Sequence, residues 1–139
     1  MKDIQSLLLL HEGERLKPYR CTAGKLSIGV GRNLDDTGIS HEESLCLLAN
    51  DIRRAEQDVL RSFAWAKGLD PVRFAALTDM CFNLGISRLR GFKKFLAALA
   101  VSDWQGAAIE MMDSAWARQV GQRAFRLRNM VLTGLWPDK

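Results

Sequence analysis

Residues 11–34 read HEGERLKPYRCTAGKLSIGVGRNL, and this stretch decides the fold, because a helix ends at a glutamate and a glycine-rich hairpin follows it. Eight residues separate Glu12 from Cys21, and five separate Cys21 from Ser27. A carboxyl group at the end of an apolar helix lies where burial can raise its pKa, which suits a group that must carry a proton near neutral pH. The hairpin can present a second polar group opposite that acid.

Apolar periodicity on either side of this stretch predicts the flanking helices. Ile4, Leu7 and Leu8 recur at helical spacing, so we expect a short first helix over residues 3–11 that Gly13 can end. Between residues 17 and 34, proline and glycine punctuate short β-compatible pieces, with residues 23–25 as the expected turn of a small sheet. Residues 40–43, Ser-His-Glu-Glu, form a capping box and predict a long helix over residues 41–62.

Helical signals continue to the C-terminus. Asp70 and Pro71 are an N-cap and a first-turn proline, and they predict a helix that ends near Gly85. Gly91 precedes another helix, which reaches about residue 100. A second capping box at residues 102–105 predicts a helix to about residue 116, and a last helix over residues 119–132 should end at Gly134.

These elements predict one α+β domain over residues 1–139. We expect a small N-terminal β-hairpin lobe, about residues 12–60, and a helical C-terminal lobe, residues 61–139 plus the first helix. The long helix should join the two lobes, with an active-site cleft between them. At this length a chain can bury a self-sufficient core.

The three cysteines predict neither a disulfide framework nor a metal site. Cys21, Cys46 and Cys81 are widely spaced and form no C-x-x-C pair. We therefore expect no metal and no cofactor. Cys46 and Cys81 lie on apolar helical faces, where cysteine is usually a structural residue.

Charge is unevenly distributed, with a net value of +4. Residues 86–139 hold nine Lys/Arg against four Asp/Glu, whereas residues 1–85 hold 11 against 12. A basic surface favours a polyanionic partner, which could be a bacterial cell wall or a nucleic acid. The early apolar run Leu7–Leu10 is too short for a signal peptide or a membrane span, so we expect neither an export signal nor stable membrane insertion.

Glycoside hydrolysis needs an acid on one side of the bond and a water-activating or nucleophilic group on the other. The segment from Glu12 to Leu34 resembles the active-site region of the phage-type lysozymes, the endolysins of glycoside hydrolase family 24. Members show Glu, eight residues, Asp or sometimes Cys, five residues, and Thr. The same positions here hold Glu12, Cys21 and Ser27. Further likenesses follow in order: Gly38-Ile39-Ser40, Phe82-Asn83-Leu84-Gly85, Gly91-Phe92, Trp104, Gln122-Arg123-Ala124 and Thr133-Gly134.

The resemblance implies a lysozyme (EC 3.2.1.17) that hydrolyses the β-1,4 bond between N-acetylmuramic acid and N-acetylglucosamine in peptidoglycan. Glu12 would be the general acid, with Cys21 and Ser27 holding a water on the other side in an inverting reaction. A Cys21 thiolate could also attack carbon directly. Arg123 would orient Glu12. Arg32 stands where some members carry histidine and receives no catalytic role.

Asn83 and Met80 are expected to face the cleft. Asn83 would bind an acetamido group of the substrate, and the alternative is a structural amide at a helix end. We expect most of Phe82, Phe92, Trp104 and Trp116 to belong to the core rather than to a sugar platform.

Such an endolysin would be a monomer that stays in the host cytoplasm until a separate holin-type membrane protein lets it reach the periplasm or cell wall. Two other functions stay open. A non-catalytic peptidoglycan-binding pseudo-lysozyme would explain why Cys21 and Ser27 replace the commoner residues. A basic helical nucleic-acid binder would explain the charge, but it leaves the spacing from Glu12 to Ser27 unexplained.

Overall fold

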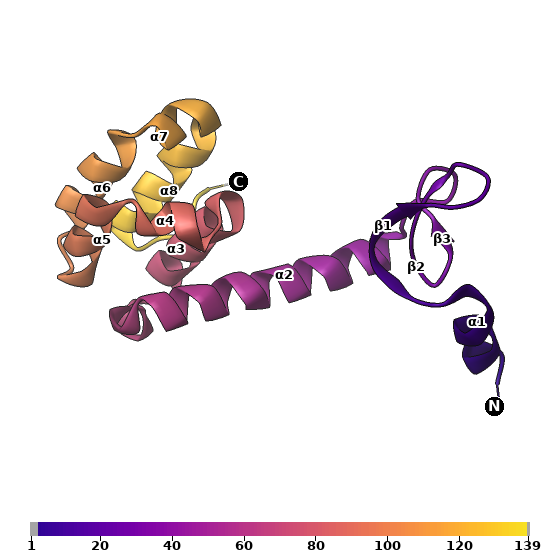
Figure 1. Cartoon of the computed structure of the whole chain (residues 1–139). Coiled ribbons are helices and arrows are strands. Elements are labelled where there is room, and N and C mark those ends of the chain that lie inside the picture. Colours follow the sequence, from indigo (N-terminus) through magenta and orange to yellow (C-terminus); the bar gives the residue numbers. More distant parts are fainter. Residues whose placement is uncertain (1–2, 139) are drawn as a thin grey trace. The chain divides into compact units, whose positions relative to one another are not determined.

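The structure, a computed structural model, describes residues 3–138, which fall into two compact units that meet between Leu47 and Leu48. This boundary lies inside the long helix α2 (His41–Ser62). The first unit contains α1 (Ile4–Glu12) and three short strands, and the helices after α2 gather in the second (Figure 1). Helices together with one small sheet confirm the predicted α+β class. The predicted lobe limits stay a prediction.

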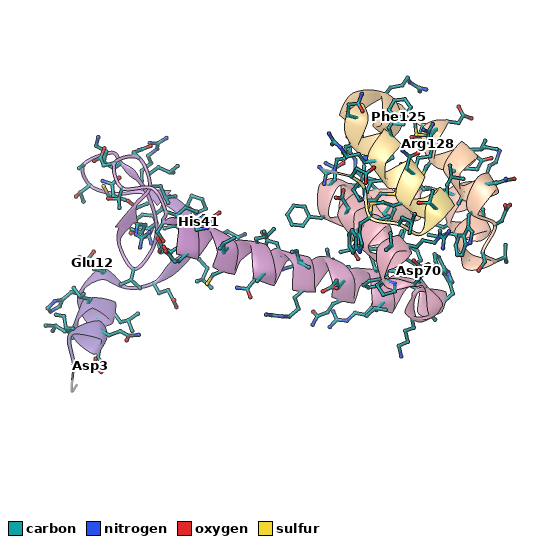
Figure 2. The ribbon with its side chains drawn as sticks, turned by 180° about the vertical axis from the view of Figure 1, so that it is seen from behind. Asp3, Glu12, His41, Asp70, Phe125 and Arg128 are labelled. Carbon is teal, nitrogen blue, oxygen red and sulfur yellow. The ribbon has the colours of Figure 1, made fainter. Side chains whose placement is uncertain are left out.

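Helix α1 begins and ends where its sequence predicts. The side chain of Asp3 accepts a hydrogen bond from the backbone N–H of Ser6 at 2.7 Å, which satisfies one of the free donors of the first turn. Gly13 follows with φ 71°, a left-handed value that glycine adopts without steric cost. Asp3 and Glu12 therefore mark the two ends of this helix (Figure 2).

The sheet is antiparallel, with strand order β1-β2-β3: β1 (Arg15–Arg20), β2 (Leu26–Gly29) and β3 (Arg32–Asn33). Ser27 in the central strand lies opposite Tyr19 on one side and Asn33 on the other. Pairing between β1 and β2 is irregular ahead of Tyr19, where Pro18 has no N–H to donate. Gly24, with φ 77°, lies in the predicted turn between them.

Helix α2 has the predicted bounds, and its capping box is formed as the sequence indicates. The backbone N–H of Ser40 donates to the Glu43 carboxylate at 2.8 Å, and the N–H of Glu43 donates to the Ser40 hydroxyl at 3.1 Å. These reciprocal bonds satisfy two donors at the start of the helix.

The second unit has a continuous apolar core. Its helices after α2 are η1 (Ala64–Gly68), α3 (Pro71–Leu84), α4 (Ile86–Arg90), α5 (Lys93–Ala100), α6 (Trp104–Met112), α7 (Ala115–Val120) and α8 (Gln122–Thr133). The largest fully buried side chains are those of Val59, Leu77, Met80, Leu89, Phe95, Leu99, Met111 and Val131. Cys81 is buried among them, as predicted, whereas Cys46 is exposed on α2.

Arg73, in the first turn of α3, joins the start of that helix to the end of α8. Its guanidinium donates to the backbone oxygens of Val131 at 2.7 Å and Leu132 at 3.1 Å. It also pairs with Asp70, the predicted N-cap of α3, at 3.1 Å, and its Cζ lies 4.0 Å from the centre of the Trp104 ring. Carbonyl groups left free by the end of one helix thus bind a cation from another.

In the second unit one predicted helix end and one predicted helix start are wrong, and two short helices were not predicted. The helix that begins near residue 104 ends at Met112, because the hydroxyl of Ser114 accepts from the N–H of Ala117 and starts α7. Gly121, with φ 58°, then separates α7 from α8, where one helix over residues 119–132 was expected. The short helices η1 and α4 were not predicted, because neither has a side-chain cap to mark its start.

The cap of α6 also differs from the prediction. Asp103, not Ser102, accepts the capping hydrogen bond, from the N–H of Gly106 at 3.0 Å. Ser102 precedes this cap with φ 60°, the one non-glycine residue with positive φ among residues 3–138. A left-handed conformation is unfavourable for a residue with a β-carbon.

The first unit is held together differently from the second. Among residues 3–47 Ser27 is the only buried residue. Hydrogen bonds, ion pairs and caps therefore carry the structure of this unit, because hydrophobic burial contributes little.

The conformation of Ser102 leads to a stability prediction. Replacing it with glycine should raise the free energy of unfolding by about 0.5–1 kcal/mol, since the left-handed strain of about 1–2 kcal/mol exceeds the extra entropy of glycine in the unfolded chain. Urea unfolding followed by circular dichroism measures the change. Ser87→Gly, at an exposed position in α4, is the control and should be destabilising; equal losses in both variants would contradict the explanation.

Candidate active site

Cys21 and Ser27 lie at the turn end of the first hairpin. Cys21 follows β1 directly, and its N–H donates to the carbonyl of Lys25 at 2.9 Å, so the turn folds back beside it. Ser27 lies in β2 and is only 3% exposed, and its hydroxyl donates to the Lys25 carbonyl at 3.3 Å. The same hydroxyl lies near enough to the Cys21 thiol to help lower its pKa. The thiol and the hydroxyl can therefore hold one small molecule, such as water, jointly.

The surroundings of Cys21 favour its thiolate form. The backbone N–H of Lys25 makes the largest contribution, followed by the N–H of Ala23, and the Ser27 hydroxyl adds a further donor. Together they lower the pKa of Cys21 from its ordinary value, against a smaller opposing effect of burial. Because the thiolate is the basic and nucleophilic form of cysteine, this turn prepares Cys21 for reaction.

Glu12 is the last residue of α1, and its carboxyl group lies beside the turn between β2 and β3. Its Oε2 is 3.0 Å from the position that a β-carbon on Gly31 would take. Within its own unit Glu12 is exposed, so the burial expected from the sequence is not found there. The first unit thus contributes all three predicted catalytic residues, on α1 and on the hairpin that follows it.

Arg32 has a structural role in this unit. Its guanidinium binds both carboxylate oxygens of Glu43 at 2.7 Å and also donates to the carbonyl of Gly38 at 3.2 Å. The Arg32 hydrogen bond is the main cause that lowers the pKa of Glu43 to about 2, and the Ser40 N–H adds to it. This bidentate ion pair fixes β3 to the first turn of α2.

Asn83 lies at the end of α3 in the second unit, and its carbonyl group is already engaged. Its Oδ1 accepts a hydrogen bond from Nε1 of Trp116 at 2.8 Å. An indole N–H can only donate, so the amide oxygen must face Trp116 and the NH₂ group points elsewhere. Trp116 is buried, as expected for a core aromatic residue.

Phe92 and Trp104 also pack against the core as expected, whereas Phe82 is 47% exposed. The expectation that Met80 faces a cleft is wrong, because Met80 is 0% exposed and lies inside the core. On the same helix Asn83 is exposed. Residues 80 and 83 are three positions apart, about 60° around the helix, so the edge of the buried face passes between them.

Arg123 forms an ion pair that the sequence did not indicate. Its Nε donates to Asp79 on α3 at 2.8 Å. Both side chains line a groove of about 840 Å³ within the second unit, together with the exposed ring of Phe82. Two other arginines, Arg126 and Arg128, follow on α8, and the guanidinium of Arg128 lies 4.9 Å from the Phe125 ring centre (Figure 2).

Residues 3–138 contain no group of three or more side chains suited to holding a metal ion. Every helix in this part of the chain is too short or too polar to span a bilayer.

Comparison with known proteins identifies the family. The phage lysozyme family model matches residues 10–135, nearly the whole chain. The match includes the helix end at Glu12, the hairpin with Cys21 and Ser27, and the helices that carry Asn83 and Arg123. The chain belongs to the phage lysozyme family. It is therefore a hydrolase of the muramidase type.

Individual relatives extend this finding. The chain is 28% identical to a probable T4-type lysozyme of Dictyostelium discoideum over 96% of both chains. It is 31% identical to an endolysin of Acyrthosiphon pisum secondary endosymbiont phage 1, over 84% of this chain and 80% of that one. It also matches 28% of the length of the pre-baseplate central spike protein Gp5 of Enterobacteria phage T4, at 27% identity over 95% of this chain.

The pair between Arg32 and Glu43 predicts how the stability of the protein depends on pH. The folded-state pKa of Glu43 lies near 2, below its ordinary value of 4.5, so its stabilising effect is present above pH 4.5 and is lost as the pH falls toward 2. Glu43→Gln should therefore be less stable than wild type at pH 6, and the difference should shrink over that acid range. Thermal unfolding at a series of pH values measures it.

The matched control for this experiment is Glu42→Gln, which removes a neighbouring exposed carboxylate from the same first turn. It should leave the acid-dependent part of the stability in place. A Glu43→Gln protein that keeps the same pH dependence as wild type would show that the pair with Arg32 does not hold this unit together.

Proposed function

We propose that this protein is an endolysin, a lysozyme (EC 3.2.1.17) of glycoside hydrolase family 24. It hydrolyses the β-1,4 bond between N-acetylmuramic acid and N-acetylglucosamine in peptidoglycan and so lyses the host cell. The match of residues 10–135 to the phage lysozyme family, which includes the spacing of Glu12, Cys21 and Ser27, is the observation that carries this proposal. The names of the relatives describe lysozymes and an endolysin, so a non-catalytic wall-binding protein is not favoured.

The reaction begins with the acid. Protonated Glu12 transfers its proton to the glycosidic oxygen, and the bond between that oxygen and the anomeric carbon breaks. A water molecule held by Cys21 and Ser27 attacks the anomeric carbon from the opposite face, and the Cys21 thiolate takes the proton that this water releases. The configuration at carbon inverts, and exchange with solvent returns both groups to their starting protonation states.

The thiolate form of Cys21 can act as the base. A neutral thiol is a poor base, but the N–H groups of Lys25 and Ala23 shift the ionisation of Cys21 toward the form that can accept a proton. Ser27 keeps the hydroxyl of the threonine found in the family pattern, so it still has one proton to donate and two lone pairs. The two replaced residues thus retain the chemistry that the reaction needs.

Residues of the second unit assist in substrate recognition. The NH₂ group of Asn83, whose oxygen is occupied by Trp116, donates to an acetamido group of the substrate. The surplus of basic residues in the C-terminal third attracts the protein to the anionic wall. The protein acts as a monomer, stays in the cytoplasm of the host until a holin-type protein opens the membrane, and then reaches the periplasm or wall.

Removing the acid tests the mechanism directly. Glu12→Gln should lower the rate at which the protein clears a suspension of permeabilised Gram-negative cells by about 100-fold or more, since it removes the proton that the leaving oxygen needs. Circular dichroism checks that the fold is intact. Glu14→Gln, an exposed carboxylate two residues away, serves as the control and should keep full activity. Lysis at the wild-type rate by Glu12→Gln would exclude Glu12 as the acid.

Cys21 is tested by replacing it in two ways. Cys21→Asp supplies a carboxylate base and should stay active, with the acidic limb of its pH–rate profile moved to lower pH because a carboxylate ionises at about pH 4. Cys21→Ala has no base and should be at least about 100-fold slower. Cys46→Ala, which removes an exposed thiol on α2, is the control. If Cys21→Ala were as active as wild type, Cys21 would only fill space.

A further inference from the structure

Gly29, the last residue of β2, and Gly31, in the turn between β2 and β3, both have a positive φ but have different surroundings. Gly29 has φ 68° and Gly31 has φ 70°, both in the left-handed region where a side chain is unfavourable. A β-carbon added to Gly29 would meet nothing within 4 Å. A β-carbon added to Gly31 would lie 3.0 Å from Oε2 of Glu12, 3.3 Å from its Cδ and 3.5 Å from its Cγ.

The end of the Glu12 side chain therefore occupies the space that a side chain on Gly31 would fill. Carbon atoms in ordinary contact are about 3.5–4.0 Å apart, so a methyl group on residue 31 would push the carboxyl group away by several tenths of an ångström. This displacement should hardly change the stability of the fold, because the end of a glutamate side chain is flexible. It should lower the catalytic rate, since a misplacement of about 1 Å can cost about 100-fold in rate.

The turn that carries Gly31 is itself held in place. Arg32, the next residue, pairs with Ile28 across the turn and binds Glu43 and the carbonyl of Gly38. Gly31 is thus a fixed surface, and the carboxyl group of Glu12 is the part that would move.

We propose that Gly31 is a positioning residue for the reaction. The bare backbone of Gly31 forms the surface against which the carboxyl group of Glu12 rests, and the lack of a side chain there determines where Glu12 delivers its proton. This inference rests on the proposed function, in which Glu12 is the general acid. It gives the two glycines different roles, because Gly29 meets only the conformational demand of the turn.

Comparing Gly31→Ala with Gly29→Ala tests the inference, since both variants put a side chain at a residue with positive φ. Their melting temperatures should fall by similar amounts. The kcat of Gly31→Ala should be at least about 10-fold lower than that of Gly29→Ala, with KM alike in the two variants, because only the acid is displaced. Equal kcat values in two folded variants would overturn the inference.

A second measurement does not depend on activity. In protein labelled with ¹³C at the glutamate carboxyl carbons, the Glu12 resonance is identified by its absence from Glu12→Gln. This resonance should shift in Gly31→Ala and stay in place in Gly29→Ala. An unshifted resonance in Gly31→Ala would show that residue 31 does not set the position of the carboxyl group, whether or not Glu12 is the acid.

Shortening the acid provides a rescue. In Glu12→Asp the carboxyl group withdraws from residue 31, so adding Gly31→Ala to that variant should cost no more than adding Gly29→Ala, within about two-fold. A full additional 10-fold loss would count against the contact. The activity of Glu12→Gln separates the two proposals: if that variant retains lysis, the proposed function fails, while the resonance shift still decides whether Gly31 positions Glu12.

Discussion

The first unit depends on the carboxylate of Glu43. Only Ser27 is buried among residues 3–47, so this part of the chain lacks an apolar core that could fix its strands. Glu43 binds the guanidinium of Arg32 through both oxygens and also accepts the N–H of Ser40. One carboxylate thereby joins β3, the loop after it and the start of α2. The turn against which Glu12 lies is held by this pair.

The proposed active-site residues of this unit obtain their properties from backbone groups. Cys21 is made more acidic mainly by the N–H groups of Lys25 and Ala23, and Glu12 is placed by a residue that has no side chain. Backbone groups are fixed by the hydrogen bonding of the hairpin, so they lose little entropy when they act on a side chain. This arrangement explains how a thiol and a hydroxyl can stand where most family members use a carboxylate and a threonine.

The sequence predicts elements whose signals are local and misses those that depend on packing. Ser40 and Asp70 lie next to the helices they cap, and both caps were predicted. The sequence also predicts that Cys21 lies near Ser27, because a tight turn between them fixes the hairpin register. In contrast, the partner of Arg123 is Asp79, 44 positions earlier, and only the packing of α8 on α3 brings them together.

The sequence also does not predict which of two like residues contacts a given side chain, or where a helix is interrupted. The sequence shows two glycines around Val30, and nothing in their order tells which one lies against Glu12. Similarly, the break between α7 and α8 depends on the left-handed conformation of Gly121, which a glycine permits but does not require. Motif spacing therefore predicts the candidate catalytic residues, whereas only the structure shows which glycine lies against Glu12.

The contacts of Arg73 have a topological consequence. Arg73, in the first turn of α3, binds the carbonyls at the end of α8. The two ends of the segment from α3 to α8 therefore lie next to each other. A segment with adjacent ends can be spliced into a longer polypeptide, or reconnected in a new order, without stretching its interior.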